Sequence, residues 1–338
     1  MRVISLSQYI VVSVAAVAGL ASILRPEITH AAVSLPVPFT MQAPYSQWGV
    51  QPWEDACEEA VIIMVDHFYS GVRTAKLPPA TAASSIMHVV RLENNHFGFN
   101  KDTNAAQMVE IINNFFRWEA REVPDPTIEM IKAEIDAGRP VIVPFHGKAV
   151  YNPYFRGAGP DYHTAVIKGY DDATKDFIVQ EPGNGWGLDY RYSYATLMDA
   201  MHDFLPSNNT KNGKKVAVFT SPSMSDLSAQ ADGDNDGLSK QDELVHGSIL
   251  WLTDSDGDGF TDGEEITFGY SPTINENTLG QGSLVKLLED PKVYLLDNGL
   301  RRHILNEQVF LSHGWKWSDI HVVGTTFFQK YPAGNPVQ

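Results

Sequence analysis

The chain has 338 residues with 41 acidic and 25 basic side chains, a formal net charge of −16. This negative balance argues against nucleic acid as a partner, because a phosphate backbone needs a basic surface. The single cysteine excludes an internal disulfide, so packing or bound metal must stabilise the fold.

The first residues have the features of an export signal. Arg2 precedes an apolar run over residues 9–24, and small residues follow near Ala31. The run is shorter than the roughly 20 residues of a membrane span. The pattern predicts a signal peptide over residues 1–31 and a secreted or cell-surface protein. The alternative is an uncleaved anchor, which would hold the protein at a membrane.

Helical patterns come first in the next part of the chain. Residues 57–71, CEEAVIIMVDHFYSG, predict a helix with Asp55 as N-cap and Gly71 at its end. The spacing of apolar residues predicts further helices over 104–118 and 128–137.

Strand patterns follow. Short β-rich runs bounded by Gly, Pro or Asp occupy residues 140–147, 164–171, 176–182 and 214–220. Helices before strands predict an α+β domain over residues 36–222, with a helical part packed on an antiparallel sheet.

The lone cysteine lies in the first turn of its predicted helix, where unpaired N–H groups and the helix dipole lower a thiol pKa. Glu58 and Glu59 beside Cys57 oppose ionisation, so a cationic imidazole would be needed. His163 begins a strand, and a hairpin would place Glu181 across from it, where a carboxylate could hold the imidazole. The alternatives are an inert buried cysteine and an edge-strand histidine.

Four stretches together resemble a known family. They are VPFTMQAP, CEEAVIIMVDHFYSG, GRPVIVPFHGKAVYNPYF and DYHTAVIKGYDDATKDFIVQEPG. Their order and spacing resemble the secreted, papain-clan cysteine peptidase-like domains related to the bacteriocin-processing (double-glycine leader) peptidases, over residues 36–220. The resemblance implies a papain-like fold, with Cys57 as nucleophile and His163 as general base and then acid.

The resemblance also implies two supporting residues. The acid before Pro182 would orient the imidazole; the family usually has Asp there, whereas this chain has Glu181, with Asp176 as the alternative. A glutamine would donate to the oxyanion. The VPF-x-x-Q pattern identifies it as Gln42, and Gln51, six positions before the cysteine, is the alternative.

Residues 230–265 hold eleven acids and one lysine. Two stretches there fit the calcium-loop pattern D-x-[DN]-x-[DN]-G-x5-E, with starts 22 residues apart. Carboxylates at these positions suit a cation that takes six to eight oxygens, such as Ca²⁺. The predicted ligands are Asp232, Asp234, Asp236, the Leu238 carbonyl and Glu243 in the first loop, and Asp254, Asp256, Asp258, the Phe260 carbonyl, Asp262 (through water) and Glu265 in the second.

The surroundings of these loops favour a structural role. Lys240 occupies the water-bridging position of the first loop, so weaker binding is expected there. SMSDLSAQ is a poor entering helix, which disfavours a helical pair of EF-hands. Residues 223–275 are similar to the thrombospondin type 3 repeats of secreted bacterial proteins. The prediction is a spacer stiffened by two structural Ca²⁺ ions.

The last part, residues 282–338, predicts a small β-rich module. A hairpin is expected across residues 297–299, then a short helix over 307–312 and a strand over 320–324. Five residues of this module have two equally supported interpretations. They could form a face for wall polymer or glycan, or a small core with a solvated rim: Arg301, Arg302, His303, Trp315 and Trp317.

No GxSxG, HExxH, P-loop or CxxC pattern occurs in the sequence. The sequence thus predicts a secreted or cell-surface cysteine peptidase that cleaves a peptide or isopeptide bond of a peptide or protein substrate. Two alternatives remain open: a non-catalytic peptide- or wall-binding protein on the same fold, and a cysteine acyltransferase or amidase.

Overall fold

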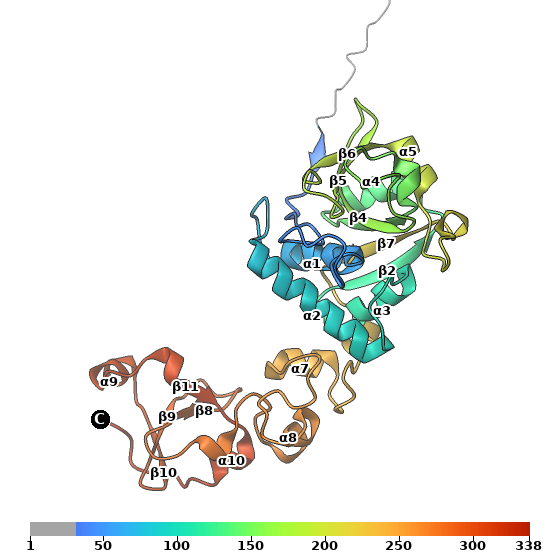
Figure 1. The fold of residues 1–338 in the computed structure, drawn as a ribbon. Coiled ribbons are helices and arrows are strands. Elements are labelled where there is room, and N and C mark those ends of the chain that lie inside the picture. Colours follow the sequence, from blue (N-terminus) through green and yellow to red (C-terminus); the bar gives the residue numbers. More distant parts are fainter. Residues whose placement is uncertain (1–31) are drawn as a thin grey trace, which may run out of the picture.

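The computed structural model describes residues 32–338, so the predicted signal peptide over 1–31 lies outside the described part of the chain. Three parts follow one another: a large mixed domain, an acidic segment, and a small module at the C-terminal end (Figure 1). No helix within residues 32–338 is both long and apolar enough to cross a membrane.

A seven-stranded sheet forms the centre of the large domain. Its strands run in the order β2-β7-β3-β4-β5-β6, and β1 also pairs with β4. Every one of these pairs is antiparallel. The strands are β1 Val33–Ser34, β2 Glu119–Pro124, β3 Val141–Phe145, β4 His163–Asp171, β5 Asp176–Gln180, β6 Tyr190–Ser193 and β7 Val216–Ser221. The predicted α+β class with an antiparallel sheet is confirmed.

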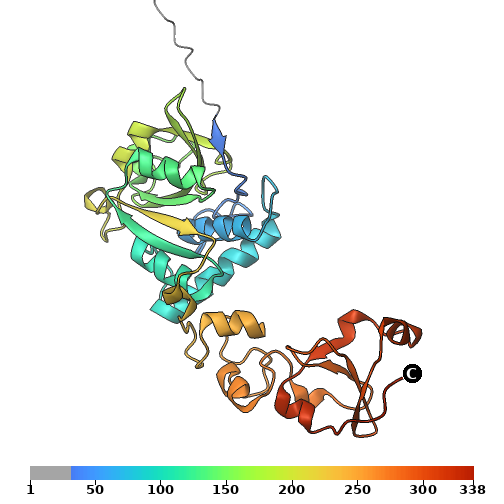
Figure 2. The ribbon, with the colours of Figure 1, turned by 180° about the vertical axis from the view of Figure 1, so that it is seen from behind.

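Helices cover both faces of this sheet. They are α1 Cys57–Tyr69, α2 Pro79–Phe97, α3 Ala105–Phe115, α4 Ile128–Asp136 and α5 Tyr194–Ala200. One core lies between the sheet and α1, α2 and α3, and a second core lies under α4 and α5. Figure 2 shows the same arrangement from behind.

The alternation of strand side chains explains why the central strands are apolar throughout. In β3, Ile142 belongs to the core under α1, whereas Val141 and Val143 belong to the core under α4. Successive side chains point to opposite faces of a strand, and both faces are buried here. An apolar run such as VIVPF therefore predicted a strand without showing polar alternation.

The predicted helices are present as α1, α3 and α4, but one detail is wrong. Ala56 occupies the N-cap position of α1, and no side chain caps that helix. The carboxylate of Asp55 instead accepts a hydrogen bond from Gln51 and pairs with Lys101. α2, β2 and β6 were not predicted, because Ala, Ser, Asn and charged residues dilute their apolar patterns.

In the acidic segment, a short helix follows each predicted calcium loop. The helices are α6 Asp226–Ala229, α7 Lys240–His246 and α8 Asp262–Phe268. Only the four-residue α6 precedes the first loop. The arrangement differs from an EF-hand pair, in which a full helix also enters each loop.

The acidic segment is fastened to the large domain. The Lys240 side chain is buried, and its Nζ donates to the main-chain carbonyl of Asn113 in α3 at 3.0 Å. Gly233 lies so close to Phe115 that a Cβ atom there would be 2.7 Å from the ring. Trp251 packs on His88 of α2, with 4.0 Å between ring centroids. Lys240, at the water-bridging position of the first loop, thus anchors that loop to α3.

The C-terminal module has a four-stranded sheet in the order β10-β9-β8-β11. Its elements are β8 Leu284–Lys286, β9 Tyr294–Asp297, β10 Leu300–His303, α9 Glu307–Ser312, β11 Ile320–Val322 and α10 Thr325–Gln329. The β9–β10 hairpin turns at Asn298 and Gly299, both with positive φ, as the Asp-Asn-Gly sequence predicted.

All five residues proposed for a glycan face contact other residues of the module, and the two arginines donate hydrogen bonds to main-chain carbonyls. Arg301 donates to the main-chain carbonyl of Phe328 at 3.0 Å, and Arg302 donates to that of Asn335 at 2.9 Å. Both guanidinium groups therefore hold the C-terminal tail. Trp317 stacks on the buried Phe310, with centroids 4.2 Å apart. These contacts give the two arginines a structural role, while part of the Trp317 indole remains exposed.

Candidate active site

Cys57 is the first residue of α1, and its side chain is only 3% exposed. The first N–H groups of a helix have no acceptor within it, so the main-chain N–H of Cys57 points out of the helix end with the positive end of the dipole. α1 packs directly on β4, the strand that begins at His163. The helix and the strand thereby bring the two predicted residues to one place.

Aromatic rings fix the imidazole of His163. Phe145 of β3 and Phe155 of the following loop contact it edge-on, with centroid distances of 5.4 and 5.2 Å. Gly183 closes the third side: a Cβ there would lie 2.8 Å from His163 Nε2. Packing therefore restricts the orientation of the ring.

Glu181 follows β5 and is completely buried beside His163. Its Oε1 accepts hydrogen bonds from His163 Nε2 and from the main-chain N–H of Gly183, the latter at 2.9 Å. Its Oε2 accepts from the Tyr192 hydroxyl at 2.9 Å, and Asn152 Nδ2 donates to that hydroxyl at 2.8 Å. Each carboxylate oxygen thus has a fixed donor.

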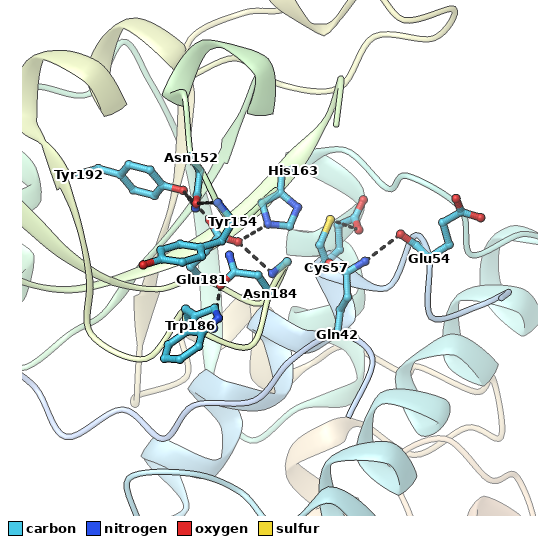
Figure 3. Close-up of polar contacts among 12 residues, drawn as sticks. Gln42, Glu54, Cys57, Asn152, Tyr154, His163, Glu181, Asn184, Trp186 and Tyr192 are labelled. Atoms are coloured by element: carbon cyan, nitrogen blue, oxygen red, sulfur yellow. Dashed lines mark hydrogen bonds and ion pairs between the residues drawn. The ribbon is translucent and has the colours of Figure 1, made fainter. Parts of the chain in front are cut away.

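The structure places the predicted residues in a row. In Figure 3 the imidazole of His163 lies between Glu181 and Cys57, and its second nitrogen, Nδ1, is on the cysteine side. The contact predicted across the β4–β5 hairpin is present. Asp176, the alternative orienter, is at the far end of β5, pairs with Asp171 across the hairpin and approaches Arg191 at 3.7 Å.

Gln42 joins the two sides of the site. Its main-chain N–H donates to the carbonyl of Pro182 at 3.0 Å. Its side-chain Nε2 donates to the carbonyls of Trp53 at 3.1 Å and Glu54 at 2.7 Å, in the loop before Cys57. Gln51 is exposed and bound to Asp55. Of the two glutamines, only Gln42 is buried against the cysteine loop.

The Cys57 thiol donates a hydrogen bond to Glu58 Oε2, with Sγ and Oε2 3.0 Å apart. Burial, and next the charge of the Glu58 carboxylate, raises the pKa of Cys57 well above its usual value, while the hydroxyl of Thr164 lowers it. Burial and the neighbouring carboxylate therefore both favour the thiol over the thiolate. The effect of the acidic neighbours is the one predicted from the sequence.

Sequence reasoning missed several parts of this site. Tyr192 and Asn152 come from β6 and from the loop after β3, and nothing in their local sequence links them to Glu181. Glu93 of α2 lies with Glu58 and Glu59 in one buried acidic cluster beside the thiol, and α2 itself was not predicted. Only tertiary packing brings these residues together.

The two acidic loops each gather three carboxylates. Ligand oxygens of Asp232, Asp234 and Asp236 lie within 4.8 Å of one another, and those of Asp254, Asp256 and Asp258 do the same. Beside them the predicted last ligands are buried: both carboxylate oxygens of Glu243 and Oε2 of Glu265 have no hydrogen-bond partner among residues 32–338. These donor sets fit a hard divalent cation.

Asp262, predicted as a water-mediated ligand, has hydrogen bonds within its own loop. Its carboxylate accepts hydrogen bonds from the main-chain N–H of Ser255 at 2.8 Å and from the Ser255 hydroxyl at 2.6 Å. Asp262 therefore shapes the second loop from within. For Leu238 and Phe260 the structure shows main-chain N–H bonds to Asp236 and Asp258, as tight loops require.

The large domain is similar to known proteins. Residues 35–209, just over half of the chain, match the Peptidase_C39 like family. No curated protein matches the chain. A crystal structure described as that of a C39-like peptidase from Bacillus anthracis is similar at 14% identity and a TM-score of 0.35, covering 56% of this chain and 98% of that one. The chain therefore belongs to the Peptidase_C39 like family, which its residues 35–209 match.

Proposed function

We propose that this protein is a secreted or cell-surface cysteine peptidase that cleaves a peptide or isopeptide bond through an acyl-enzyme. The observation that carries the proposal is the row of Glu181, His163 and Cys57, with the free imidazole nitrogen on the cysteine side (Figure 3). A buried carboxylate that fixes the imidazole is what a Cys-His pair needs to exchange a proton reliably.

In the proposed reaction, His163 Nδ1 takes the thiol proton and the Cys57 thiolate attacks the carbonyl carbon of the substrate. The imidazolium, held by Glu181, then gives its proton to the leaving amine as the C–N bond breaks. Water, deprotonated by His163, attacks the resulting thioester and releases the acid and the thiol. Each proton taken up by His163 is returned within the cycle.

The oxyanion that forms in each step needs donors beside Cys57. The main-chain N–H of Cys57 at the start of α1 is one. Gln42 is the other: its Nε2 would turn the N–H now shared with Trp53, the longer of its two bonds, toward the oxyanion. One such donor contributes on the order of 3 kcal/mol to lowering the barrier.

We propose that the acidic loops bind two structural Ca²⁺ ions. The support is the pair of three-carboxylate groups, each beside a buried glutamate with unpartnered oxygens. The cations would supply the charge that allows these side chains to lie together, and binding would be linked to folding of residues 223–275. Calcium concentrations outside cells suffice for sites of modest affinity.

For the C-terminal module we propose attachment to, or recognition of, a cell-wall polymer. Trp317 supports this, since its indole is 54% exposed although it stacks on Phe310. Amphipathic aromatic rings at a surface suit carbohydrate and peptide ligands alike. Arg301 and Arg302 are occupied internally and would contribute little.

One observation favours a second candidate, a non-catalytic peptide-binding protein on the same fold. Cys57 Sγ contacts Glu58 Oε2, and burial raises the pKa of the thiol, which favours an unreactive sulfur. The two candidates differ in whether His163 can remove the thiol proton.

Turnover by the full chain distinguishes them. The protein, in calcium, is incubated with a proteome-derived peptide library, and new termini are identified by mass spectrometry. We expect cleavage by the parent and by Lys175→Ala, a control at an exposed lysine, and none by Cys57→Ala. Equal cleavage by Cys57→Ala would refute the peptidase proposal. Products that carry an added amine would indicate acyl transfer instead.

A further inference from the structure

The carboxyl group of Glu58 contacts the reacting sulfur directly. Cys57 Sγ and Glu58 Oε2 are 3.0 Å apart, and both side chains are almost completely buried, at 3% and 1% exposed. The second oxygen, Oε1, has no hydrogen-bond partner among residues 32–338. A carboxylate in this place is costly, because burial removes water from the charge and nothing replaces it.

The groups that face Glu58 add no positive charge. Glu59 follows it on the same helix, Glu93 comes from α2, and Asp102 comes from the loop before α3. None of these three meets a cation within ion-pair distance in the described structure: the neighbouring lysine, Lys101, pairs with Asp55 at 3.2 Å.

The residues that face the cluster from the start of β4 carry no permanent charge: two are neutral hydroxyl groups, and the third is His163, which exchanges a proton with the thiol. Tyr162, just before β4, donates its hydroxyl to the carbonyl of Thr103, and Thr164 offers a hydroxyl near the sulfur. Of the labelled side chains drawn beside the sulfur in Figure 3, His163 is the basic one. Several carboxyl groups and one imidazole lie together here. Their electrostatic free energy is lowest when the carboxyl group next to the sulfur keeps its proton, because fewer negative charges are then buried side by side.

We propose that Glu58 is a catalytic residue that works as a carboxylic acid: protonated, it donates a hydrogen bond to the Cys57 thiolate, and when ionised it returns the sulfur to the thiol. The proposal rests on the peptidase function above and adds a regulation of the same site by pH. It gives this enzyme an acidic working range.

The proton count is simple. In the active form Glu58 is neutral, Cys57 is a thiolate and His163 is an imidazolium, so the sulfur has two donors and no adjacent negative charge. When Glu58 loses its proton to solvent, carboxylate and thiolate would lie 3 Å apart. Transfer of the imidazolium proton back to sulfur relieves that repulsion and leaves the hydrogen-bonded thiol of this structure.

Burial, and next the charge of Glu59, raises the pKa of Glu58 well above its usual value, which extends the range over which the acid form exists. The sign of the effect follows. Reactive thiolate is present below the raised pKa of Glu58 and is lost as the pH rises through it. At still higher pH the thiol ionises without help.

The test is the rate at which iodoacetamide alkylates Cys57 in the full chain with calcium, followed by intact mass from pH 4 to 10. Because the chain has one cysteine, the mass change reports this sulfur alone. Parent, Glu58→Gln, Glu59→Gln and His163→Ala are compared, after circular dichroism has shown that each variant is folded.

For the parent we expect a reactive range at acidic pH, a fall as Glu58 ionises, and a second rise above the thiol pKa. Glu58→Gln keeps an N–H donor beside the sulfur at every pH, so the fall in alkylation rate should disappear. At pH 8 its alkylation rate should exceed that of the parent at least about tenfold, the effect of one pKa unit. Glu59→Gln is the matched control, because it removes a neighbouring charge but no contact with sulfur. Its alkylation rate should still fall as Glu58 ionises, but at a lower pH than in the parent.

Two results would overturn the proposal: a parent rate that rises steadily with pH, or a Glu58→Gln profile equal to the parent's. His163→Ala separates this from failure of the peptidase function itself. If acid reactivity is lost in His163→Ala but Glu58→Gln behaves as the parent does, the Cys-His pair stands and the role of Glu58 is wrong.

Discussion

Packing around one ring decides how well His163 can serve the thiol. Its Nε2 is held by Glu181, whose other oxygen is held by Tyr192, and the ring faces are bounded by Phe145 and Phe155. The side chain of Glu181 is longer by one bond than the Asp that the family resemblance implied. The hydrogen bonds from Gly183 and Tyr192 hold its carboxylate in place beside His163. The longer side chain is compatible with an oriented imidazole.

Gly183 tests this packing. A methyl group at residue 183 would lie 2.8 Å from His163 Nε2, so the loop would have to move and its N–H would leave Glu181. Gly183→Ala should lower the rate of cleavage by about 10- to 100-fold, as small displacements of catalytic groups do. Gly185→Ala is the control, because its Cβ meets only Met41 Sδ at an ordinary 3.7 Å. Equal activity in both variants would contradict the packing argument.

At the scale of elements, the sequence predicted those parts whose side-chain periodicity is strong. α1 is apolar enough to be recognised, and Cys57 at its start and His163 at the start of β4 followed from element boundaries. The contact of Glu181 with His163 was predictable because a hairpin relates residues close in sequence, whereas the pairing of His163 with Cys57 was implied by the family resemblance.

Other contacts depend on residues far apart in sequence, and no pattern shows them. Tyr192 meets Glu181 through the β5–β6 pairing, Lys240 meets Asn113 across 127 positions, and Glu93 reaches the thiol cluster from α2. Composition showed that acids surround Cys57 but did not show which of them touches the sulfur.

The acidic segment should respond to calcium before the rest of the molecule. Without cations the carboxylates of each loop repel one another, whereas the contacts of Lys240 and Trp251 with the large domain do not involve ligands. Chelation should therefore produce new protease cuts within residues 223–275 first. A cutting pattern identical with and without chelator would show that the proposed ligands are wrong.

Glu265→Gln should reduce the calcium stoichiometry measured by titration calorimetry from two to one.

The stability of the whole molecule should depend on pH through the buried acidic cluster. Burial, and next the charge of Glu58, raises the pKa of Glu93 to about 8. The folded state therefore keeps a proton that the unfolded chain loses above pH about 4.3. This stabilisation is complete below that pH and is lost as the pH rises through about 8.

Urea unfolding with saturating calcium measures the effect. The parent should be less stable at pH 9 than at pH 5, and Glu93→Gln should be more stable than the parent at pH 9 by on the order of 1–3 kcal/mol, with a flatter pH dependence. Thr103 can still donate to the amide oxygen of the glutamine. An unchanged slope in Glu93→Gln would mean that this carboxyl group does not carry the buried proton.

The central claim is that His163 makes the lone thiol of this family member a nucleophile. Its most direct test is the acid limb of the Cys57 alkylation profile in the full chain, compared between parent and His163→Ala. In the parent we expect a reactive thiolate at pH values well below the usual thiol pKa of about 8.5. In His163→Ala we expect that reactivity to be lost. Slow alkylation at acidic pH in both proteins would contradict the account and identify Cys57 as an inert, buried cysteine.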